Sequence, residues 1–275
     1  EVIVMPLWVA AILGAVQGLA EFLPISSSGH LALVQSVLHF EQYNVDAVAF
    51  DLVLHLGTLV AVVIAFWSDV KTLVVSFVQW VIDGFRIRSR PSRRLIVLLL
   101  LATLPLALGA VLEHYVKAAF TSTLFIGIAL CFTAGMLWVA SRHAGGKKTE
   151  ADAPYSDGLK VGLWQLIALF PGVSRSGSTI CGGLFSGFQK DFAVRFGFLM
   201  SIPAVCGAAV FSLPDLLHGG LDKTLLAPCI VGFVVSALCG YLAIFTVRLL
   251  MKKNSFRWFS LYCLAVGVLT IVLSL

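Results

Sequence analysis

Charged residues are scarce in this chain. Asp, Glu, Lys and Arg make up only 12% of the 275 residues, whereas 59% are hydrophobic, and the mean hydropathy is +0.99. A soluble domain carries roughly twice that charged fraction. Because so few charges could not cover a water-facing surface, the sequence predicts an integral membrane protein with lipid as its solvent.

Signatures of several soluble classes are also missing. The six cysteines lie inside apolar stretches without Cys-x-x-Cys spacing, so we expect free buried thiols and no disulfide or zinc framework. No Gly-x-x-x-x-Gly-Lys-Ser/Thr motif is present, which excludes a P-loop nucleotide enzyme. The cations cluster in connections between apolar runs, a pattern typical of membrane topology, so we expect no nucleic-acid partner.

Long apolar runs are abundant, and six of them approach or exceed the roughly 20 residues that a helix needs to cross a bilayer. They cover residues 48–66, 95–112, 124–140, 192–213, 225–246 and 258–275. A shorter run over 8–23 lacks a basic leader and a cleavage site, so we expect it to belong to the fold. The connections at 71–94, 142–148 and 248–257 hold most of the cations, which predicts that they face the cytoplasm.

Two short motifs recur along the chain. Residues 26–29 (Ser-Ser-Ser-Gly) recur as 174–177 (Ser-Arg-Ser-Gly), and 47–50 (Ala-Val-Ala-Phe) recur as 193–196 (Ala-Val-Arg-Phe). The order and the nearly constant offset indicate a duplication.

We interpret residues 1–146 as a first repeat and 147–275 as a second, within one integral membrane domain. Each holds an interrupted helix pair, at about 8–40 and about 158–188, followed by three spans. An odd number of crossings inverts the second half. The predicted fold is therefore an all-α polytopic membrane protein with an inverted-topology repeat.

Both interrupted pairs are predicted to be re-entrant hairpins. Residues 8–22 would form about 22 Å of helix, short of a hydrocarbon core of about 30 Å. Pro24 and Pro171 break the two pairs, because proline lacks the N–H that a helix interior requires. Irregular backbone at membrane depth survives only where it is buried in protein or lines a wet cavity, so the two loops should meet and form the site.

Gln17 and Glu21 stand four residues apart, which places both on one helical face. A carboxylate inside an apolar helix needs a partner or a function, although an interfacial pair capping a helix end would share this spacing. A carboxylate with an amide oxygen suits Mg²⁺ or Ca²⁺, so both residues are candidate metal ligands.

The serines at 26–28 precede a predicted helix, where hydroxyls and free N–H groups can bind an anion. His30 lies within one helical turn of Ser27, so a serine nucleophile with a histidine base is feasible. A simple helix cap and a hydrogen-bonded core histidine explain the same residues equally well.

Arg175 lies among hydroxyls and glycines in residues 171–179, Pro-Gly-Val-Ser-Arg-Ser-Gly-Ser-Thr. A guanidinium matches phosphate oxygens in pairs and keeps its charge. A snorkelling arginine fits poorly, because the predicted hairpin places this residue deep. The candidate phosphate-binding residues around it are Ser26, Ser28, Ser174, Ser176 and Thr179.

These motifs resemble the signature of the undecaprenyl-diphosphate phosphatases of the bacitracin-resistance type. That family's pattern is [Glu/Gln]-x-x-x-Glu with Pro-Gly-x-Ser-Arg-Ser-x-x-Thr, and residues 17–21 and 171–179 match it, together with Ser27 and His30. The resemblance covers essentially the whole chain. Gln17 is an allowed variant, but it weakens any mechanism that needs two carboxylates there.

The resemblance implies hydrolysis of undecaprenyl diphosphate to undecaprenyl phosphate and inorganic phosphate, on the outer side of the bacterial cytoplasmic membrane. Such enzymes recycle the cell-wall carrier lipid, confer bacitracin resistance and depend on a divalent cation, usually Mg²⁺ or Ca²⁺. In this interpretation Glu21, Ser27, His30 and Arg175 are catalytic, with Ser27 as nucleophile and His30 as base. Direct attack by water stays open.

Other functions also stay open. Inverted repeats with broken helices are the layout of many secondary transporters, so a lipid phosphate could be moved and not cleaved. An intramembrane serine protease would use Ser-Gly with His55 but would give Arg175 and Glu21 no role. The type-2 phosphatidic-acid phosphatases are disfavoured, because Cys181 stands where they carry a histidine.

The remaining polar residues of the apolar runs received a structural interpretation. We expect Asp51, His55 and Arg195 to be interior hydrogen-bonding or interfacial residues. The expected partners are a polyprenyl diphosphate and membrane lipids, and a homodimer stays open.

Overall fold

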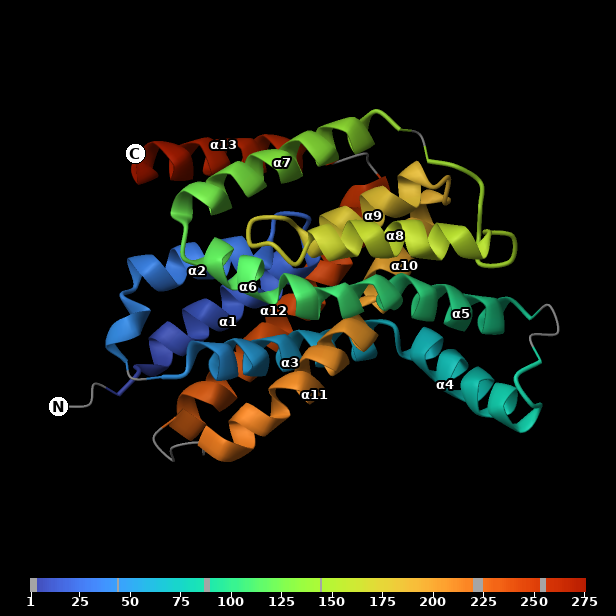
Figure 1. The fold of residues 1–275 in the computed structure, drawn as a ribbon, viewed down its shortest axis with the longest axis horizontal. Coiled ribbons are helices and arrows are strands. Elements are labelled where there is room, and N and C mark those ends of the chain that lie inside the picture. The colour runs from blue at the N-terminus through green and yellow to red at the C-terminus, as the bar shows by residue number, and fades with distance from the viewer. Residues whose placement is uncertain (1–3, 44, 87–89, 144, 220–224, 253–255) are drawn as a thin grey trace.

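The computed structural model describes residues 4–43, 45–86, 90–143, 145–219, 225–252 and 256–275, and leaves the side chains of 211–219 and 251–252 undescribed. In this part of the chain the regular structure is helical (Figure 1). The helices of the first half are α1 (Leu7–Phe22), α2 (Ser27–Val37), η1 (Phe40–Gln42), α3 (Ala47–Ala65), α4 (Trp67–Ile82), α5 (Pro91–Thr103), η2 (Leu104–Leu108), α6 (Gly109–Phe120) and α7 (Thr123–Ser141). Those of the second half are α8 (Tyr155–Ile167), α9 (Arg175–Phe185), α10 (Lys190–Leu199), α11 (Ser201–Gly219), α12 (Leu226–Lys252) and α13 (Phe256–Ser274).

Six helical stretches are long and apolar enough to cross a membrane, and each contains most of one predicted run. They are Ala47–Ala65, Pro91–Phe120, Thr123–Ser141, Lys190–Val210, Leu226–Leu250 and Phe256–Ser274. The prediction of six spans, three in each half, is confirmed. The chain is therefore a multi-pass membrane protein.

Helix α4 was not expected, because Asp69 and Lys71 interrupt its hydrophobic pattern and suggested a simple connection. The structure extends the chain as a helix for 16 residues beyond α3. Its large apolar side chains are mostly exposed, among them Trp67, Phe77 and Ile82. An exposed apolar face beside charged residues is typical of a helix that lies along a membrane surface.

Both predicted helix breaks are confirmed. Helix α1 ends at Phe22 and α2 begins at Ser27, whereas α8 ends at Ile167 and α9 begins at Arg175. In Figure 1 the α1–α2 pair extends to the left and the α8–α9 pair to the right, and their loops approach one another near the centre.

A glycine at the second break allows this close approach. Gly172 has a φ of +92°, and a Cβ there would lie 2.6 Å from the carbonyl oxygen of Ile126. Only glycine tolerates both the backbone conformation and the contact. Gly29 lies against Gly172 from the other loop, where an added Cβ would be 3.0 Å from the Gly172 Cα.

Small residues bring each short helix against a long helix of the other half. A Cβ on Gly14 would lie 2.5 Å from the Gly232 oxygen, and one on Gly18 would lie 2.5 Å from the Ser236 oxygen. The contact moves forward along α12 as it moves forward along α1, so the two helices run parallel. This close backbone approach is the usual way in which small residues support helix association in membranes.

Helix α8 packs on α5 in the same manner. A Cβ on Gly158 would lie 2.9 Å from the Leu98 oxygen, and one on Gly162 would lie 2.5 Å from the Ala102 oxygen. These two helices also run parallel. The first short helix of each half thus packs against a helix of the opposite half that belongs to a candidate span.

The last helices of the two halves, α7 and α13, pair antiparallel (Figure 1). The Ser274 hydroxyl donates to Thr123 Oγ1 at 3.0 Å at one end of the pair. Nearer the other end, the Ser260 hydroxyl donates to the Ala134 oxygen at 2.7 Å.

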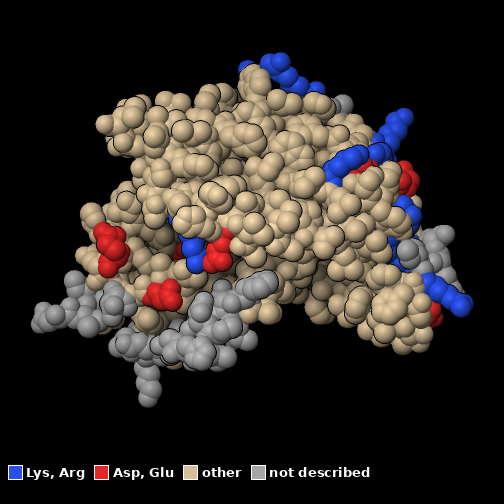
Figure 2. Space-filling model, in the orientation of Figure 1, with Lys and Arg blue, Asp and Glu red and all other residues tan. Residues whose placement is uncertain are grey.

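Charge gathers at the ends of the molecule and is sparse between them. In Figure 2 most of the Lys and Arg side chains lie toward the right, the side on which α4 ends and α5 and α8 begin in Figure 1, and a broad uncharged surface occupies the middle. Arg195 pairs with Asp69 at 2.6 Å and Glu150 at 2.9 Å, and its place at a membrane interface stays a prediction. All six cysteines are free thiols, as predicted, although Cys206 is exposed and only Cys181 and Cys263 are fully buried.

Candidate active site

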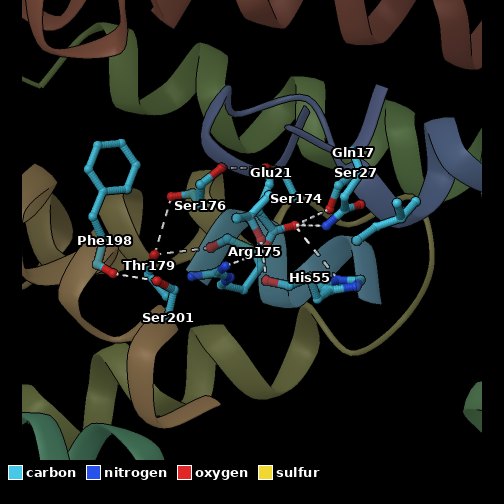
Figure 3. Close-up of polar contacts among 12 residues, drawn as sticks. Gln17, Glu21, Ser27, His55, Ser174, Arg175, Ser176, Thr179, Phe198 and Ser201 are labelled. Carbon is cyan, nitrogen blue, oxygen red and sulfur yellow. Dashed lines mark hydrogen bonds and ion pairs between the residues drawn. The ribbon is translucent and has the colours of Figure 1, made fainter. Parts of the chain in front are cut away.

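The carboxylate of Glu21 occupies the centre of a polar cluster between the two broken helix pairs (Figure 3). It projects from the last turn of α1, and its side chain is only 5% exposed. Gln17, one turn earlier, donates from Nε2 to Glu21 Oε2 at 3.1 Å. The predicted pairing of these residues on one helical face is therefore seen directly.

Ser27 also contacts this carboxylate. Its hydroxyl, at the first residue of α2, donates to Glu21 Oε2 at 2.6 Å. A hydroxyl that donates to a carboxylate has an acceptor in place for its proton, which is the arrangement that an activated serine needs.

Arg175 reaches the cluster from the second half of the chain. It is the first residue of α9, and its Nη2 donates to Glu21 Oε1 in an ion pair. The Arg175 Nη1 is buried and has no hydrogen-bond partner among the described residues. A buried guanidinium nitrogen without a partner is costly, so it points to a ligand that this cluster would bind.

The other hydroxyls hold the two loops in position. Ser174 caps α9 by accepting from the Gly177 N–H at 3.0 Å, and Ser26 caps α2 by accepting from the Gly29 N–H at 3.3 Å. The Ser176 hydroxyl donates to the Leu23 oxygen at 3.0 Å, which ties the second loop to the first. The bonds of Ser174 and Ser26 are helix-cap contacts of the kind that the serine-rich motifs predicted.

Two predicted phosphate-binding residues have mainly local contacts. The Thr179 hydroxyl donates to the Arg175 backbone oxygen at 3.0 Å, one turn back in α9. Ser28 Oγ lies 3.4 Å from Ser26 Oγ.

His30 lies beside the cluster and turns away from Ser27. One ring nitrogen, Nδ1, is 2.8 Å from the backbone oxygen of Ser26, and the other, Nε2, is 2.9 Å from the Tyr262 hydroxyl on α13. The His30 and Tyr262 rings are stacked. In this arrangement Glu21, and not His30, is the acceptor of the Ser27 hydroxyl.

Sequence reasoning missed His55 as a member of the cluster. His55 lies on α3. Its Nε2 is 3.9 Å from Glu21 Oε2, and its Nδ1 is 2.8 Å from the backbone oxygen of Asp51. A signal existed, since an ionisable residue inside an apolar span is by default a functional candidate. Asp51 itself accepts from Gln35 at 2.8 Å, as expected for an interior hydrogen-bonding residue.

Thr133 was also missed. Its hydroxyl donates to the Gly172 oxygen at 2.9 Å and accepts from the Ser174 N–H at 3.1 Å. It therefore fixes the second loop from α7. A single threonine within an apolar run gives no sequence signal of such a role.

The donor set suits a hard divalent cation that takes part of its coordination from elsewhere. Gln17 Oε1 is buried and has no hydrogen-bond partner among the described residues, and the Nε2 of the same amide donates to the Glu21 carboxylate. No group of three or more His, Cys, Asp or Glu residues in the described chain could hold a metal by itself. Mg²⁺ commonly binds one or two protein carboxylates together with waters and substrate phosphates, so these residues fit it.

The cluster combines a hydroxyl, a carboxylate and a guanidinium in a largely buried setting. The hydroxyl can attack, the carboxylate can take its proton, and the guanidinium can stabilise a developing negative charge. This is a suitable arrangement for phosphoryl transfer, in which catalysis depends mainly on positioning and electrostatic stabilisation.

Comparison with known proteins agrees with this geometry. The family model described as "Bacitracin resistance protein BacA" matches residues 10–269. A protein of Methanosphaera stadtmanae named undecaprenyl-diphosphatase is 41% identical, covering 96% of this chain and 97% of its own. Undecaprenyl-diphosphatases of Alkaliphilus metalliredigens (40% identical, 97% of this chain and 98% of theirs) and Rubrobacter xylanophilus (41%, 97% and 97%) are similar over the same extent. From the match over nearly its whole length, the chain belongs to the bacitracin resistance protein BacA family.

Proposed function

We propose that this protein is an undecaprenyl-diphosphatase, a phosphoric anhydride hydrolase that converts undecaprenyl diphosphate to undecaprenyl phosphate and inorganic phosphate. The observation that carries the proposal is the contact of Glu21 with both Ser27 and Arg175, which joins the two motifs in one site. Membership of a family whose relatives bear this enzyme name supports it. The reaction recycles the carrier lipid of cell-wall synthesis and counters bacitracin.

Substrate binding begins with an exchange of partners at Arg175. The guanidinium leaves Glu21 and pairs with oxygens of the terminal phosphate, for which its fork-shaped donor set is well matched. The Arg175 Nη1 has no hydrogen-bond partner among the described residues, so it can donate to a phosphate oxygen. Hydroxyls of Ser174, Ser176 and Thr179 surround the same phosphate.

Ser27 then attacks the terminal phosphorus. Its proton passes to Glu21 Oε2, a phosphorus–oxygen bond to Ser27 forms, and the anhydride bond to undecaprenyl phosphate breaks. Water next attacks the phosphoserine and releases inorganic phosphate and the free hydroxyl. Direct attack of water on the diphosphate, with Glu21 or His30 as base, is the alternative route.

His30 and His55 support this chemistry from α2 and α3. His30, held between the Ser26 oxygen and Tyr262, is placed to act as the acid or base once the substrate has opened the site. The His55 Nε2 lies 3.9 Å from Glu21 Oε2 and helps to hold that carboxylate in position.

A divalent cation, Mg²⁺ or Ca²⁺, is part of the proposal. Glu21 and Gln17 Oε1 would hold it. When bound, it would neutralise charge on the diphosphate.

The overall architecture supports an inverted-topology repeat with two re-entrant hairpins. The antiparallel α7–α13 pair and the reciprocal packing of α1 on α12 and α8 on α5 are what such a repeat requires. The cation-rich connections would then face the cytoplasm. The α1–α2 pair would open to the outer side, where the diphosphate is cleaved.

The membrane itself is proposed to be the cytoplasmic membrane. Relatives include archaeal as well as bacterial proteins, so the proposal does not depend on a bacterial source.

The test is phosphate release from undecaprenyl diphosphate by the purified protein in detergent. We expect release with Mg²⁺, loss of release with EDTA, and loss of release in Arg175→Ala. A folded wild-type protein that releases no phosphate with any divalent cation would overturn the proposal.

Lipid transport is the second candidate, because broken helices that meet at the centre are also the layout of many transporters. A flippase would move a fluorescent lipid phosphate across a vesicle membrane and release no phosphate. Transport with unchanged lipid chemistry would favour this function over hydrolysis.

A further inference from the structure

A cationic cavity, separate from the polar cluster around Glu21, lies where α7 ends and α13 begins. Its volume is about 360 Å³, and it is lined by Trp138, Ser141, Arg142 and Arg257. This volume falls within the roughly 300–1,000 Å³ of small-molecule sites. The proposed hydrolysis uses none of these residues.

Two guanidinium groups converge on one aromatic ring in this cavity. The Arg142 Cζ lies 5.2 Å from the Trp138 ring centroid, and the Arg257 Cζ lies 5.3 Å from it. The two cations thus lie around one ring, and an anion held between them would be attracted to both.

The protein supplies no such anion in the part of the chain that the structure describes, where neither arginine forms an ion pair with a carboxylate. Carboxylates of the adjoining segment have partners of their own. Glu150 pairs with Arg195, and Asp157 pairs with two lysines, Lys148 and Lys160.

The surroundings indicate a ligand that also has an apolar part. Trp138 lies in the last turn of the span Thr123–Ser141, and tryptophan and arginine at a span end mark the membrane–water boundary. Large apolar side chains of α13 are exposed directly beyond the cavity, among them Trp258, Leu261 and Leu264. They offer a surface for acyl chains that an inorganic anion would not use.

We propose that this cavity binds the headgroup of an anionic phospholipid from the leaflet at the cation-rich end of the protein. The two guanidinium groups bind the phosphodiester, for which their planar donor sets suit its oxygens. The Trp138 ring lies at the headgroup level, and the acyl chains run along α13. Basic pockets between membrane helices on this side of a bilayer are known to accept such headgroups.

Native mass spectrometry of the full chain in an uncharged detergent tests the proposal. The protein is titrated with short-chain phosphatidylglycerol, with the matching phosphatidylcholine and with inorganic phosphate. The test variant is Arg142→Gln/Arg257→Gln. The matched control, Arg90→Gln/Lys147→Gln, removes two exposed cations from the same end of the molecule.

We expect wild-type protein and the control to retain phosphatidylglycerol in preference to phosphatidylcholine. The test variant should bind phosphatidylglycerol about tenfold or more weakly. Arg142 and Arg257 are exposed, and phosphate release from undecaprenyl diphosphate should be unchanged, which shows that the variant is folded. If the double variant loses that activity, the single Arg257→Gln takes its place.

Two results would overturn the proposal. Equal weakening in the test variant and the control would mean that net charge alone attracts the lipid. Saturable binding of inorganic phosphate that displaces phosphatidylglycerol, with no preference for the lipid, would show that the cavity takes the free ion.

Discussion

Glu21 and Arg175 are 154 residues apart in the chain and form an ion pair between the two broken helix pairs. The pair neutralises two charges that neither α1 nor α9 could bury alone. It leaves the Arg175 Nη1 without a hydrogen-bond partner among the described residues. The ion pair therefore contributes to stability, and in the proposed reaction the phosphate would take the place of the carboxylate at Arg175.

Replacing Arg175 should affect activity and stability separately. Arg175→Ala leaves Glu21 buried and unpaired, which should lower the free energy of unfolding by about 3–5 kcal/mol. It should also reduce phosphate release by a factor of about 10² or more.

The double variant Arg175→Ala/Glu21→Gln separates the two effects. It should recover much of the stability, because no buried charge is left over, but none of the activity. Measurements of thermal unfolding and phosphate release on the same preparations check this, and a double variant as unstable as the single would contradict the account.

Replacing Ser27 tests the route of the reaction. If Ser27 is the nucleophile, Ser27→Ala should reduce phosphate release by at least about 10²-fold. Rapid quenching of the wild-type enzyme with labelled diphosphate should then yield a phosphoserine in the peptide that contains Ser27. An active Ser27→Ala enzyme, with no trapped phosphoserine, would establish direct attack by water.

His55 is expected to be a positioning residue. Its Nε2 lies near Glu21 Oε2 and not on the serine, so His55→Gln should lower kcat about tenfold and leave KM nearly unchanged. His114→Gln, an exposed histidine on α6, is the matched control and should have full activity. Full activity in both variants would exclude His55 from the site.

The helix contact at Gly18 should be intolerant of any side chain. A Cβ there would lie 2.5 Å from the Ser236 oxygen, so Gly18→Ala should destabilise the protein by about 1–3 kcal/mol. Gly135→Ala is the control, because nothing lies within 4 Å of a Cβ at that position. It should be neutral or slightly stabilising, since alanine is the better helix former. Equal melting temperatures for the two variants would contradict the close packing of α1 on α12.

Acid should weaken the start of α8 through Asp157. Burial alone would raise the pKa of Asp157, but hydrogen bonds from Lys148 and Lys160 outweigh it and hold the pKa below its ordinary value of 3.8. Because the pKa of Asp157 is lower in the folded protein than in the unfolded chain, its carboxylate contributes its full stabilisation at pH values above 3.8. This stabilisation is lost as the pH falls through the pKa of Asp157 in the folded protein.

Asp157→Asn should therefore melt at a lower temperature than wild type near neutral pH, and the difference should shrink below about pH 4. Thermal unfolding in detergent across this range measures it, with Glu41→Gln, an exposed carboxylate, as the control. A difference that is independent of pH would mean that the lysine contacts contribute nothing.

Much of the fold could be predicted because it depends on length and apolarity. The six spans need only a long apolar run, and the two breaks need only Pro24 and Pro171 in short ones. Helix α4 could not be predicted in this way. Its two charged residues, Asp69 and Lys71, lie near its start, and a surface helix and a charged loop look alike to a hydropathy count.

The site was predictable where its chemistry is local. Gln17 and Glu21 lie one helical turn apart, and Arg175 is conspicuous among apolar neighbours. The orientation of His30 was not predictable, because it depends on Tyr262, 232 residues further along. Nor was the part played by His55, since its distance from Glu21 arises from the packing of α3 beside α1.

Ser27 and Arg175 hold the same place in the two recurring motifs, as the second residue of Ser-Ser-Ser-Gly and of Ser-Arg-Ser-Gly. Two identical copies of either motif would bring two serines or two arginines to Glu21, so the meeting of a hydroxyl and a guanidinium at one carboxylate depends on this single difference. Changing residues 174–177 to Ser-Ser-Ser-Gly would keep the Ser174 cap of α9 and remove the arginine from Glu21.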